Sequence, residues 1–166
     1  MEDFKGILPV EPDPLRYQCV DLRMHEVFSC ISSLIRHGSR VLDVGCGTGE
    51  LIWQLKSHKM CDTVGIEPNE VRAKEALLKT NNVFIGHLDQ FMALESSKSF
   101  DHVIFADVIE HVPWPAEILR DASTLLSDTG TIILSVPNVA HWSVRLSLLR
   151  GLFDYEPCGI MDSTHL

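Results

Sequence analysis

Apolar residues in this chain follow two alternating spacings, which predict strands and helices in turn. Short continuous apolar runs predict five buried strands, within residues 41–44, 63–66, 82–85, 102–106 and 131–136. Apolar residues at helical spacing predict helices that begin after Asp21, near Gly49, after Asn69, at Pro115 and after Pro137-Asn138. Strands that alternate with helices are typical of βαβ units. We therefore expect an α/β fold with a doubly wound, mostly parallel sheet and helices on both of its faces.

Each predicted helix has an apolar face and an expected end. Gly38 should end the first helix, and Asp128-Thr129-Gly130 should turn the chain into the fifth strand. The last apolar face is interpreted as a packing stripe, or alternatively as a lid whose Arg145 or Arg150 meets an acidic substrate. The expected inward-facing residues are Met24, Val27, Phe28, Ile31, Leu34 and Ile35, then Leu51, Ile52 and Leu55, then Val71, Ala76 and Leu77, then Ile118, Leu119, Ala122, Leu125 and Leu126, and finally Trp142, Leu146, Leu149 and Phe153.

The length and composition indicate one globular domain. The chain has 166 residues, of which 45% are hydrophobic and 22% are charged, values near the globular average. Pro9, Pro12 and Pro14 predict an extended N-terminal arm over residues 1–20, which leaves residues 21–166 for the domain.

The charge and the cysteines narrow the possible partners and location. A net charge of −9 argues against binding to nucleic acid or to an anionic membrane. No apolar stretch reaches the roughly 20 residues that span a bilayer, and the N-terminus lacks the order of a signal peptide. The five cysteines form no C-x-x-C pair, so we expect reduced thiols in a cytoplasmic protein.

The first strand-to-helix turn is the expected ligand site, because parallel sheets bind ligands beyond the carboxyl ends of their strands. It reads Asp43-Val44-Gly45-Cys46-Gly47-Thr48-Gly49, and Glu50 stands where a dinucleotide fingerprint has its last glycine. A carboxylate there would repel a pyrophosphate. Glu67 ends the second strand 24 residues after Asp43, where a carboxylate can accept hydrogen bonds from ribose hydroxyls. The predicted ligand therefore contains a ribose but no pyrophosphate.

These segments resemble class I S-adenosylmethionine-dependent methyltransferases. Residues 41–49 are similar to motif I of that superfamily, residues 65–67 to motif II, and residues 100–107 and 130–138 to the fourth and fifth strands. Asp107-Val108-Ile109-Glu110-His111-Val112 and His141-Trp142-Ser143-Val144-Arg145-Leu146 are most similar to the UbiG-like and MetW-like branches. The resemblance implies a Rossmann-like fold of seven strands. Since five are predicted here, we expect a truncated domain that lacks the last two strands. The exposed sheet edge would then be covered by something beyond residue 166, by a second copy or by a partner chain.

The resemblance also implies a cofactor, S-adenosyl-L-methionine, and a role for individual residues. Asp43 would lie near the ammonium of the cofactor, Glu67 would hold the ribose, and Asp107 would lie beside the methionyl group. Asp89 would contact the adenine amino group, although capping of a helix or turn would also explain it. The implied cofactor-binding set is Asp43, Gly45, Cys46, Gly47, Gly49, Glu67, Pro68, Asp89 and Asp107.

Methyl transfer from a sulfonium is an in-line displacement, so a base is needed only where the acceptor must lose a proton. The candidate catalytic residues are Glu110, His111 and His141, although a capping or hydrogen-bonded role would explain each histidine equally well. Asp107-x-x-Glu110-His111 also resembles the Glu-x-x-Glu-His cluster that binds a divalent cation in quinone O-methyltransferases. Asp replaces the first Glu, and we predict no metal. His165 has no identifiable partner in the sequence.

Two functions follow from the resemblance. The first is a methyltransferase that acts on a small-molecule acceptor. The second is an S-adenosylmethionine-binding, non-catalytic module that regulates a partner enzyme, because MetW-like proteins are linked to a homoserine acyltransferase. The glycine spacing makes a nucleotide-linked oxidoreductase a distant third.

Overall fold

The computed structural model describes residues 22–95, 99–156 and 159–165. The expected arm over residues 1–20 lies outside these residues. The helices and strands follow one another in the predicted alternating order. They are α1 (Leu22–Leu34), β1 (Arg40–Val44), α2 (Glu50–Lys59), β2 (Asp62–Glu67), α3 (Glu70–Lys79), β3 (Val83–Ile85), α4 (Leu88–Leu94), β4 (Phe100–Ala106), the 3₁₀ helix η1 (Ile109–His111), α5 (Pro115–Thr124), β5 (Leu126–Ser135) and α6 (Trp142–Leu149).

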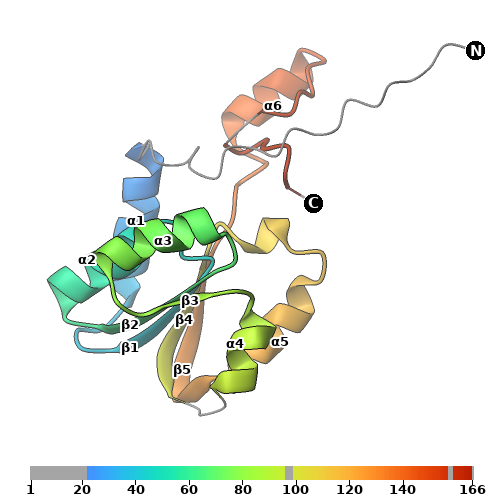
Figure 1. The fold of residues 1–166 in the computed structure, drawn as a ribbon. Coiled ribbons are helices and arrows are strands. Elements are labelled where there is room, and N and C mark those ends of the chain that lie inside the picture. The colour runs from blue at the N-terminus through green and yellow to red at the C-terminus, as the bar shows by residue number, and fades with distance from the viewer. Residues whose placement is uncertain (1–21, 96–98, 157–158, 166) are drawn as a thin grey trace, which may run out of the picture.

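The described strands form one parallel sheet with the order β3-β2-β1-β4-β5 (Figure 1). Asp43 of β1 lies opposite Gly65 of β2 on one side and opposite Ile104 of β4 on the other. The order reverses at β1, so β1 and β4 form the switch point, where ligands bind in sheets of this kind. The prediction of a doubly wound α/β fold is confirmed.

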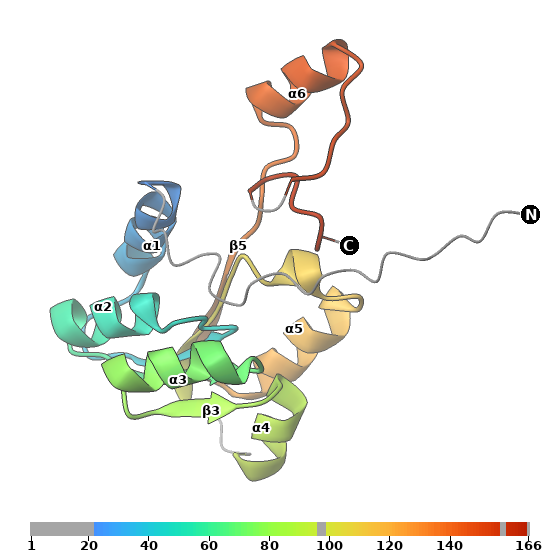
Figure 2. The same cartoon turned by 45° about the horizontal axis from the view of Figure 1, so that its top comes forward.

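Alternating residues of the central strands fill two cores on opposite faces of the sheet. Leu42 and Val44 of β1 pack with Phe91 of α4 and Ala122 of α5. Val41 belongs to the other core, whose remaining buried members include Phe28 and Ile31 of α1, Ile35 directly after it, and Leu51 and Leu55 of α2. Figures 1 and 2 show α1, α2 and α3 on one side of the strands and α4 and α5 on the other. The prediction of helices on both faces is therefore confirmed.

The structure corrects the predicted end of the first helix and contains one helix that the sequence did not predict. α1 ends at Leu34, four residues before Gly38, and Leu34 is exposed rather than inward-facing. Gly38 instead has a left-handed φ of 74° in the turn before β1, where its N–H donates to Lys59 O. The α4 helix was not predicted, because its seven residues are too few to show a helical repeat.

β5 begins earlier than the sequence predicts. Residues 128–130 lie inside this strand rather than in a turn before it. Phe100 pairs with Leu126 whereas His102 pairs with Thr131, so an irregularity in β5 accommodates the extra residues. Turn-forming residues can occupy such a bulge because its backbone departs from the regular ladder. Leu126, expected on the helix, is consequently the first residue of the strand.

Two predicted apolar faces are partly wrong. On α3, Ala73 and Ala76 are buried, and Ala76 packs against Cys46 and Ile52, whereas Val71 and Leu77 are exposed. On α6, the predicted stripe is exposed: Trp142 by 68% and Leu149 by 85%. Phe153, expected on the same helix, lies beyond its end at Leu149 and is exposed by 61%. The segment after β5 leads away from the sheet, so α6 projects from the body of the molecule (Figures 1 and 2).

The β5 edge carries an apolar groove of about 440 Å³. It is lined by α1 and β5 residues that include Cys30, Ile31, Leu34, Ile133 and Leu134. β5 pairs only with β4 in the described part of the chain. Covering of this edge, whether by something beyond residue 166, a second copy or a partner chain, stays a prediction. Among the described residues, none of the helices combines the length and the apolar character that crossing a lipid bilayer requires.

Candidate functional site

The glycine loop between β1 and α2 lies at the carboxyl end of the central strand. Gly45, Gly47 and Gly49 have φ values of 77°, 56° and 78°, a region that side chains disfavour. A Cβ on Gly45 would lie 2.6 Å from a methyl group of Val108, and one on Gly49 would lie 3.0 Å from the Ala76 backbone. A Cβ on Gly47 would meet nothing within 4 Å. Two of the glycines therefore permit close packing, whereas the third presents bare backbone to open space.

Glu67, the last residue of β2, connects this loop to the next one. Its side chain is buried, with the residue only 2% exposed. Oε2 accepts a hydrogen bond of 2.9 Å from Gly47 N, and Oε1 accepts one of 2.9 Å from Asn69 N. Each carboxylate oxygen has a further lone pair, so both can also accept a hydrogen bond from a ligand. The carboxylate thus fixes two loops and keeps acceptor capacity at their junction.

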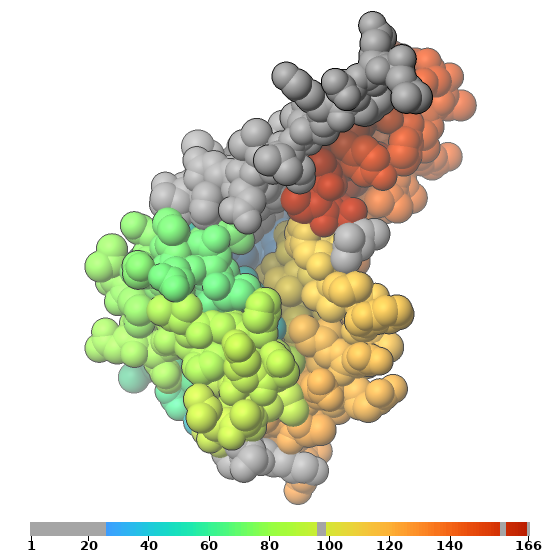
Figure 3. Space-filling model, turned by 45° about the vertical axis from the view of Figure 1, so that its right-hand side comes forward, coloured from blue at the N-terminus to red at the C-terminus, as the bar shows by residue number. Residues whose placement is uncertain are grey.

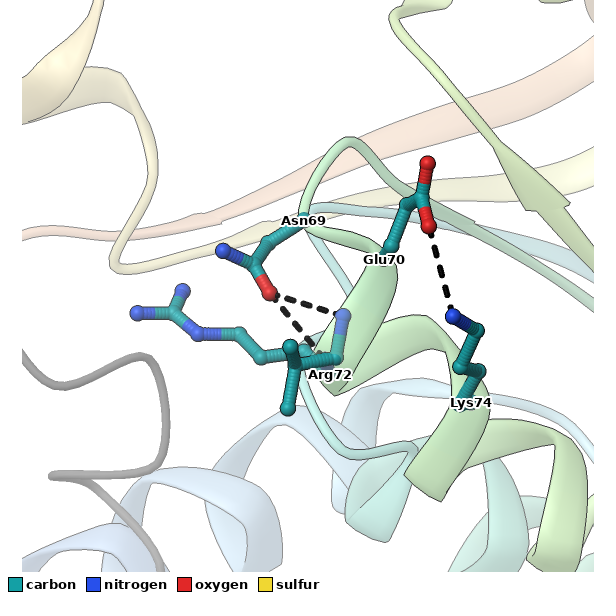
Figure 4. Close-up of polar contacts among 5 residues, drawn as sticks. Asn69, Glu70, Arg72 and Lys74 are labelled. Carbon is teal, nitrogen blue, oxygen red and sulfur yellow. Dashed lines mark hydrogen bonds and ion pairs between the residues drawn. The ribbon is translucent and has the colours of Figure 1, made fainter.

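Asn69 fixes the path of the chain after Glu67 (Figure 4). Its Oδ1 accepts hydrogen bonds from Val71 N at 3.0 Å and from Arg72 N at 3.2 Å, which confirms the predicted N-cap of α3. The Glu70–Lys74 ion pair on the next turn is exposed, so it adds little to stability. The cap therefore holds the Asn69 backbone where it donates to Glu67.

Asp43 is the most strongly perturbed carboxyl group of the site. It is 2% exposed, and its Oδ1 has no hydrogen-bond partner among the described residues. Burial, together with the nearby Glu67 carboxylate, raises the pKa of Asp43 from 3.8 to about 7. A buried carboxyl without a partner is costly to ionise, and a cation close to it would lower that cost. Asp43 therefore suits a cationic group of a ligand.

Protonation of Asp43 predicts a pH-dependent stability. The folded-state pKa lies above the unfolded value, so the folded chain binds the proton more tightly and loses stability as the pH rises from about 4 to about 7. We expect Asp43→Asn to stabilise the ligand-free protein at pH 8 by at most about 4 kcal/mol, and the gain to vanish near pH 4. Thermal unfolding of both proteins at several pH values measures this. A stability difference that does not change with pH would contradict the assignment.

Three other residues of the predicted cofactor set each have different surroundings. The Cys46 side chain is buried with Ile52 and Ala76, so only its backbone borders the loop. Burial raises the pKa of this thiol, which keeps it uncharged and unreactive. Pro68 is exposed directly after β2. Asp89 is exposed in the first turn of α4, where His87 rather than Asp89 is the N-cap.

Asp107 follows β4 and has an unusual backbone. Its φ of 52° is left-handed, which costs energy for a residue with a side chain. Asp107 N donates to the carbonyl oxygen of Ser135 at 3.2 Å and to Ser135 Oγ at 3.0 Å, while Ser135 Oγ–H donates to Asp107 Oδ1 at 2.8 Å. The end of β5 therefore fixes the turn after β4, next to Val108, which packs against Gly45.

The structure brings together Glu110, His111 and His165. The sequence offered no partner for His165. Each offers one possible metal-ligand atom within 4.8 Å of the others, and the centroids of the two imidazole rings are 5.0 Å apart. Neither carboxylate oxygen of Glu110 has a hydrogen-bond partner among the described residues. Burial raises the pKa of Glu110, and the Asp107 carboxylate adds to the rise. This cluster of two imidazoles and a carboxyl can exchange protons or bind a transition metal.

Asp107 is not part of that cluster, so the metal set suggested by Asp107-x-x-Glu110-His111 is not assembled as such. His141 is also separate from it. His141 is the N-cap of α6, where Nδ1 accepts from Ser143 N at 3.4 Å and lies 2.8 Å from Ser143 Oγ. The capping interpretation therefore accounts for His141. No local pattern pointed to His165, because it lies 54 residues from His111 in the chain.

Comparisons with known proteins agree with this geometry. A protein-family profile described as methionine biosynthesis protein MetW matches residues 25–153. The ubiquinone biosynthesis O-methyltransferase of Colwellia psychrerythraea is 30% identical over 167 residues, which cover 96% of this chain and 67% of that protein. The chain spans about half to two thirds of the length of such curated relatives.

Solved structures show the same fold. A SAM dependent methyltransferase from Archaeoglobus fulgidus superposes with a TM-score of 0.66 at 22% identity, over 85% of this chain and 60% of that one. A SAM-dependent methyltransferase from Thiobacillus denitrificans, in complex with S-adenosyl-L-homocysteine, superposes with a TM-score of 0.53 at 19% identity, over 66% and 47% of the two chains. Because the family profile covers most of its length, this chain belongs to the MetW family, within the class I S-adenosylmethionine-dependent methyltransferase superfamily.

Proposed function

We propose that this chain binds S-adenosyl-L-methionine and transfers its methyl group to a small-molecule acceptor. The observation that carries the proposal is the buried Glu67 carboxylate, which joins the Gly47 amide of the glycine loop to the Asn69 amide after β2. This arrangement offers acceptors to a ribose at the switch point of the sheet. Glu50, the first residue of α2, would instead set a carboxylate against a pyrophosphate at the start of this helix, and that carboxylate pairs with Lys79 Nζ at 2.7 Å.

The residues present fit the methionine part and the ribose of this cofactor. The unpartnered Asp43 Oδ1 suits the ammonium of the methionine part, and Gly47 presents bare backbone to it. Glu67 would accept hydrogen bonds from the ribose. The Thiobacillus denitrificans protein with the same fold binds S-adenosyl-L-homocysteine, which supports this assignment. Pro68 and Asp89 stay predictions as adenosine contacts, and so does the cytoplasmic location.

The chemistry then depends on proton removal at the acceptor. S-adenosylmethionine, when bound, supplies an electrophilic methyl group on a sulfonium. The Gly45–Val108 contact places η1 directly beside the glycine loop. Glu110 and His111 on η1 are therefore the residues that would take a proton from a hydroxyl or amine acceptor. His141, which caps α6, is the weaker candidate.

A regulatory function is the second candidate, because two features suit a protein partner. Trp142, Leu148 and Leu149 of α6 and the apolar groove along β5 are exposed. A patch of this kind is typical of an interaction surface. In this alternative the chain binds the same cofactor but acts on a partner enzyme without turnover.

Calorimetry with S-adenosylmethionine, S-adenosylhomocysteine and NAD tests the proposal first. We expect both sulfur compounds to bind and NAD to bind more weakly. Tighter binding of NAD than of S-adenosylhomocysteine would overturn it. Formation of S-adenosylhomocysteine with small phenolic acceptors is measured next, because curated relatives are named O-methyltransferases. Cofactor binding without any turnover would favour the regulatory function.

A further inference from the structure

The last described residues of the chain fold back onto η1. Figure 3 shows the red C-terminal segment directly above the yellow segment that contains η1. His111 Nδ1 lies 3.1 Å from the backbone oxygen of Thr164 and 3.2 Å from Thr164 Oγ1. One ring nitrogen of His111 therefore faces two oxygens that belong to a residue 53 positions away.

The nature of these oxygens determines which nitrogen of His111 carries the proton. A backbone carbonyl oxygen has no hydrogen and can only accept. Thr164 Oγ1–H donates to Asp162 Oδ1 at 2.7 Å, so its hydrogen points away from His111 and a lone pair remains for the ring. Both oxygens can then be satisfied only by a donor, which makes Nδ1 the protonated nitrogen of the neutral imidazole. Nε2 is left with a free lone pair.

Asp162 holds Thr164 in this orientation. Asp162 is 1% exposed, and its Oδ1 also accepts from Thr164 N at 2.8 Å. Backbone hydrogen bonds brace the segment: Glu156 N donates to Met161 O at 2.8 Å, and Ser163 N donates to Glu156 O at 3.0 Å. A buried carboxylate with two local donors is an anchor for the segment rather than a group that meets substrate.

We propose that Asp162 and Thr164 are positioning residues that hold His111 in its Nδ1–H form, so that Nε2 takes the proton of the methyl acceptor. The catalytic part rests on the proposed function. Nε2 accepts the proton from the acceptor's O–H or N–H, and the acceptor's oxygen or nitrogen forms a bond to the methyl carbon. The carbon–sulfur bond breaks, and its electron pair neutralises the sulfonium. The imidazolium that results keeps its Nδ1–H bond to Thr164 and lies beside the Glu110 carboxyl group.

The tautomer can be measured without a substrate. Long-range ¹H–¹⁵N NMR spectra of the ring nitrogens distinguish Nδ1–H from Nε2–H, and loss of signals in His111→Gln identifies the residue. The spectra are recorded on the full chain with EDTA, at about pH 9, where a histidine is neutral. We expect His111 to be predominantly Nδ1–H. Asp162→Ala should shift it toward the Nε2–H form that prevails in free histidine, whereas Asp162→Asn, which keeps an acceptor oxygen for Thr164, should leave it unchanged.

Two outcomes would overturn the proposal: an Nε2–H imidazole in the native chain, or the same tautomer in Asp162→Ala as in the native chain. Thr164→Val, which removes one of the two acceptors, should produce a smaller shift than Asp162→Ala, and Thr164→Ser should produce none. Affinity for S-adenosylhomocysteine should stay within about twofold in all of these variants, because neither residue borders the glycine loop. Failure of cofactor binding in the native chain would instead contradict the proposed function and leave the tautomer result standing.

Discussion

Gly47→Val is expected to abolish binding of S-adenosylmethionine and S-adenosylhomocysteine. A Cβ at Gly47 meets no protein atom within 4 Å, so the side chain would extend into the space proposed for the ligand. The φ of 56° is also unfavourable for a β-branched residue and would pull the Gly47 amide away from Glu67. Both effects act against the cofactor, and we expect at least about a hundredfold loss of affinity in calorimetry, which corresponds to roughly 3 kcal/mol.

Gly151→Val provides a matched control for this variant. Gly151 has a φ of 74°, and its Cβ would also meet nothing within 4 Å, but it follows α6 rather than β1. The control therefore carries a similar backbone strain at a site without a proposed ligand. Its cofactor affinity should equal that of the native chain. Normal binding by Gly47→Val would show that the glycine loop does not contact the cofactor.

Glu67→Ala should weaken cofactor binding by about ten- to a hundredfold and leave the protein folded. The change removes the proposed acceptor for the ribose, and a hydrogen bond to a charged group is worth roughly 1.5–3 kcal/mol. It also leaves the Gly47 and Asn69 amides without their acceptor, which loosens both loops. The fold should survive, because removal of the Glu67 carboxylate also reduces the electrostatic cost of the buried Asp43.

Glu50→Ala is the control for a lost carboxylate close to the same loop. Glu50 pairs with Lys79 across α2 and α3 and does not bond the glycine loop among the described contacts. We expect its affinity for S-adenosylhomocysteine to stay within about twofold of the native value. Circular dichroism of all three proteins checks that they are folded. An unchanged dissociation constant for folded Glu67→Ala would place the ribose elsewhere.

Much of the fold could be predicted because local patterns and tertiary packing agree in it. The apolar runs of β1, β2 and β4 are buried in the middle of the sheet, whereas β3 and β5 lie at its edges and are mostly half-buried or exposed. Asn69 caps α3 by accepting backbone N–H groups, and Pro115 suits the first turn of α5 because it has no N–H to leave unpaired. Disagreements arise where packing overrides the local pattern. Residues 128–130 have turn chemistry, yet pairing with β4 extends the strand through them. The apolar face of α6 has helical spacing, but spacing does not say what covers it.

Part of the candidate site could likewise be predicted from the sequence, and part depends on tertiary packing. The sequence by itself determined the glycine loop and the acidic residue after the second strand, because their chemistry depends on backbone freedom and charge at positions that a βαβ unit brings to one edge. Tertiary structure alone decided that both Glu67 oxygens hold loop amides, that Cys46 turns into the core, and that Asp43 is buried without a partner for Oδ1. It also decided that Thr164 and His165 meet His111. Contacts over 53 residues depend on where the chain returns in space, and no local periodicity encodes that return.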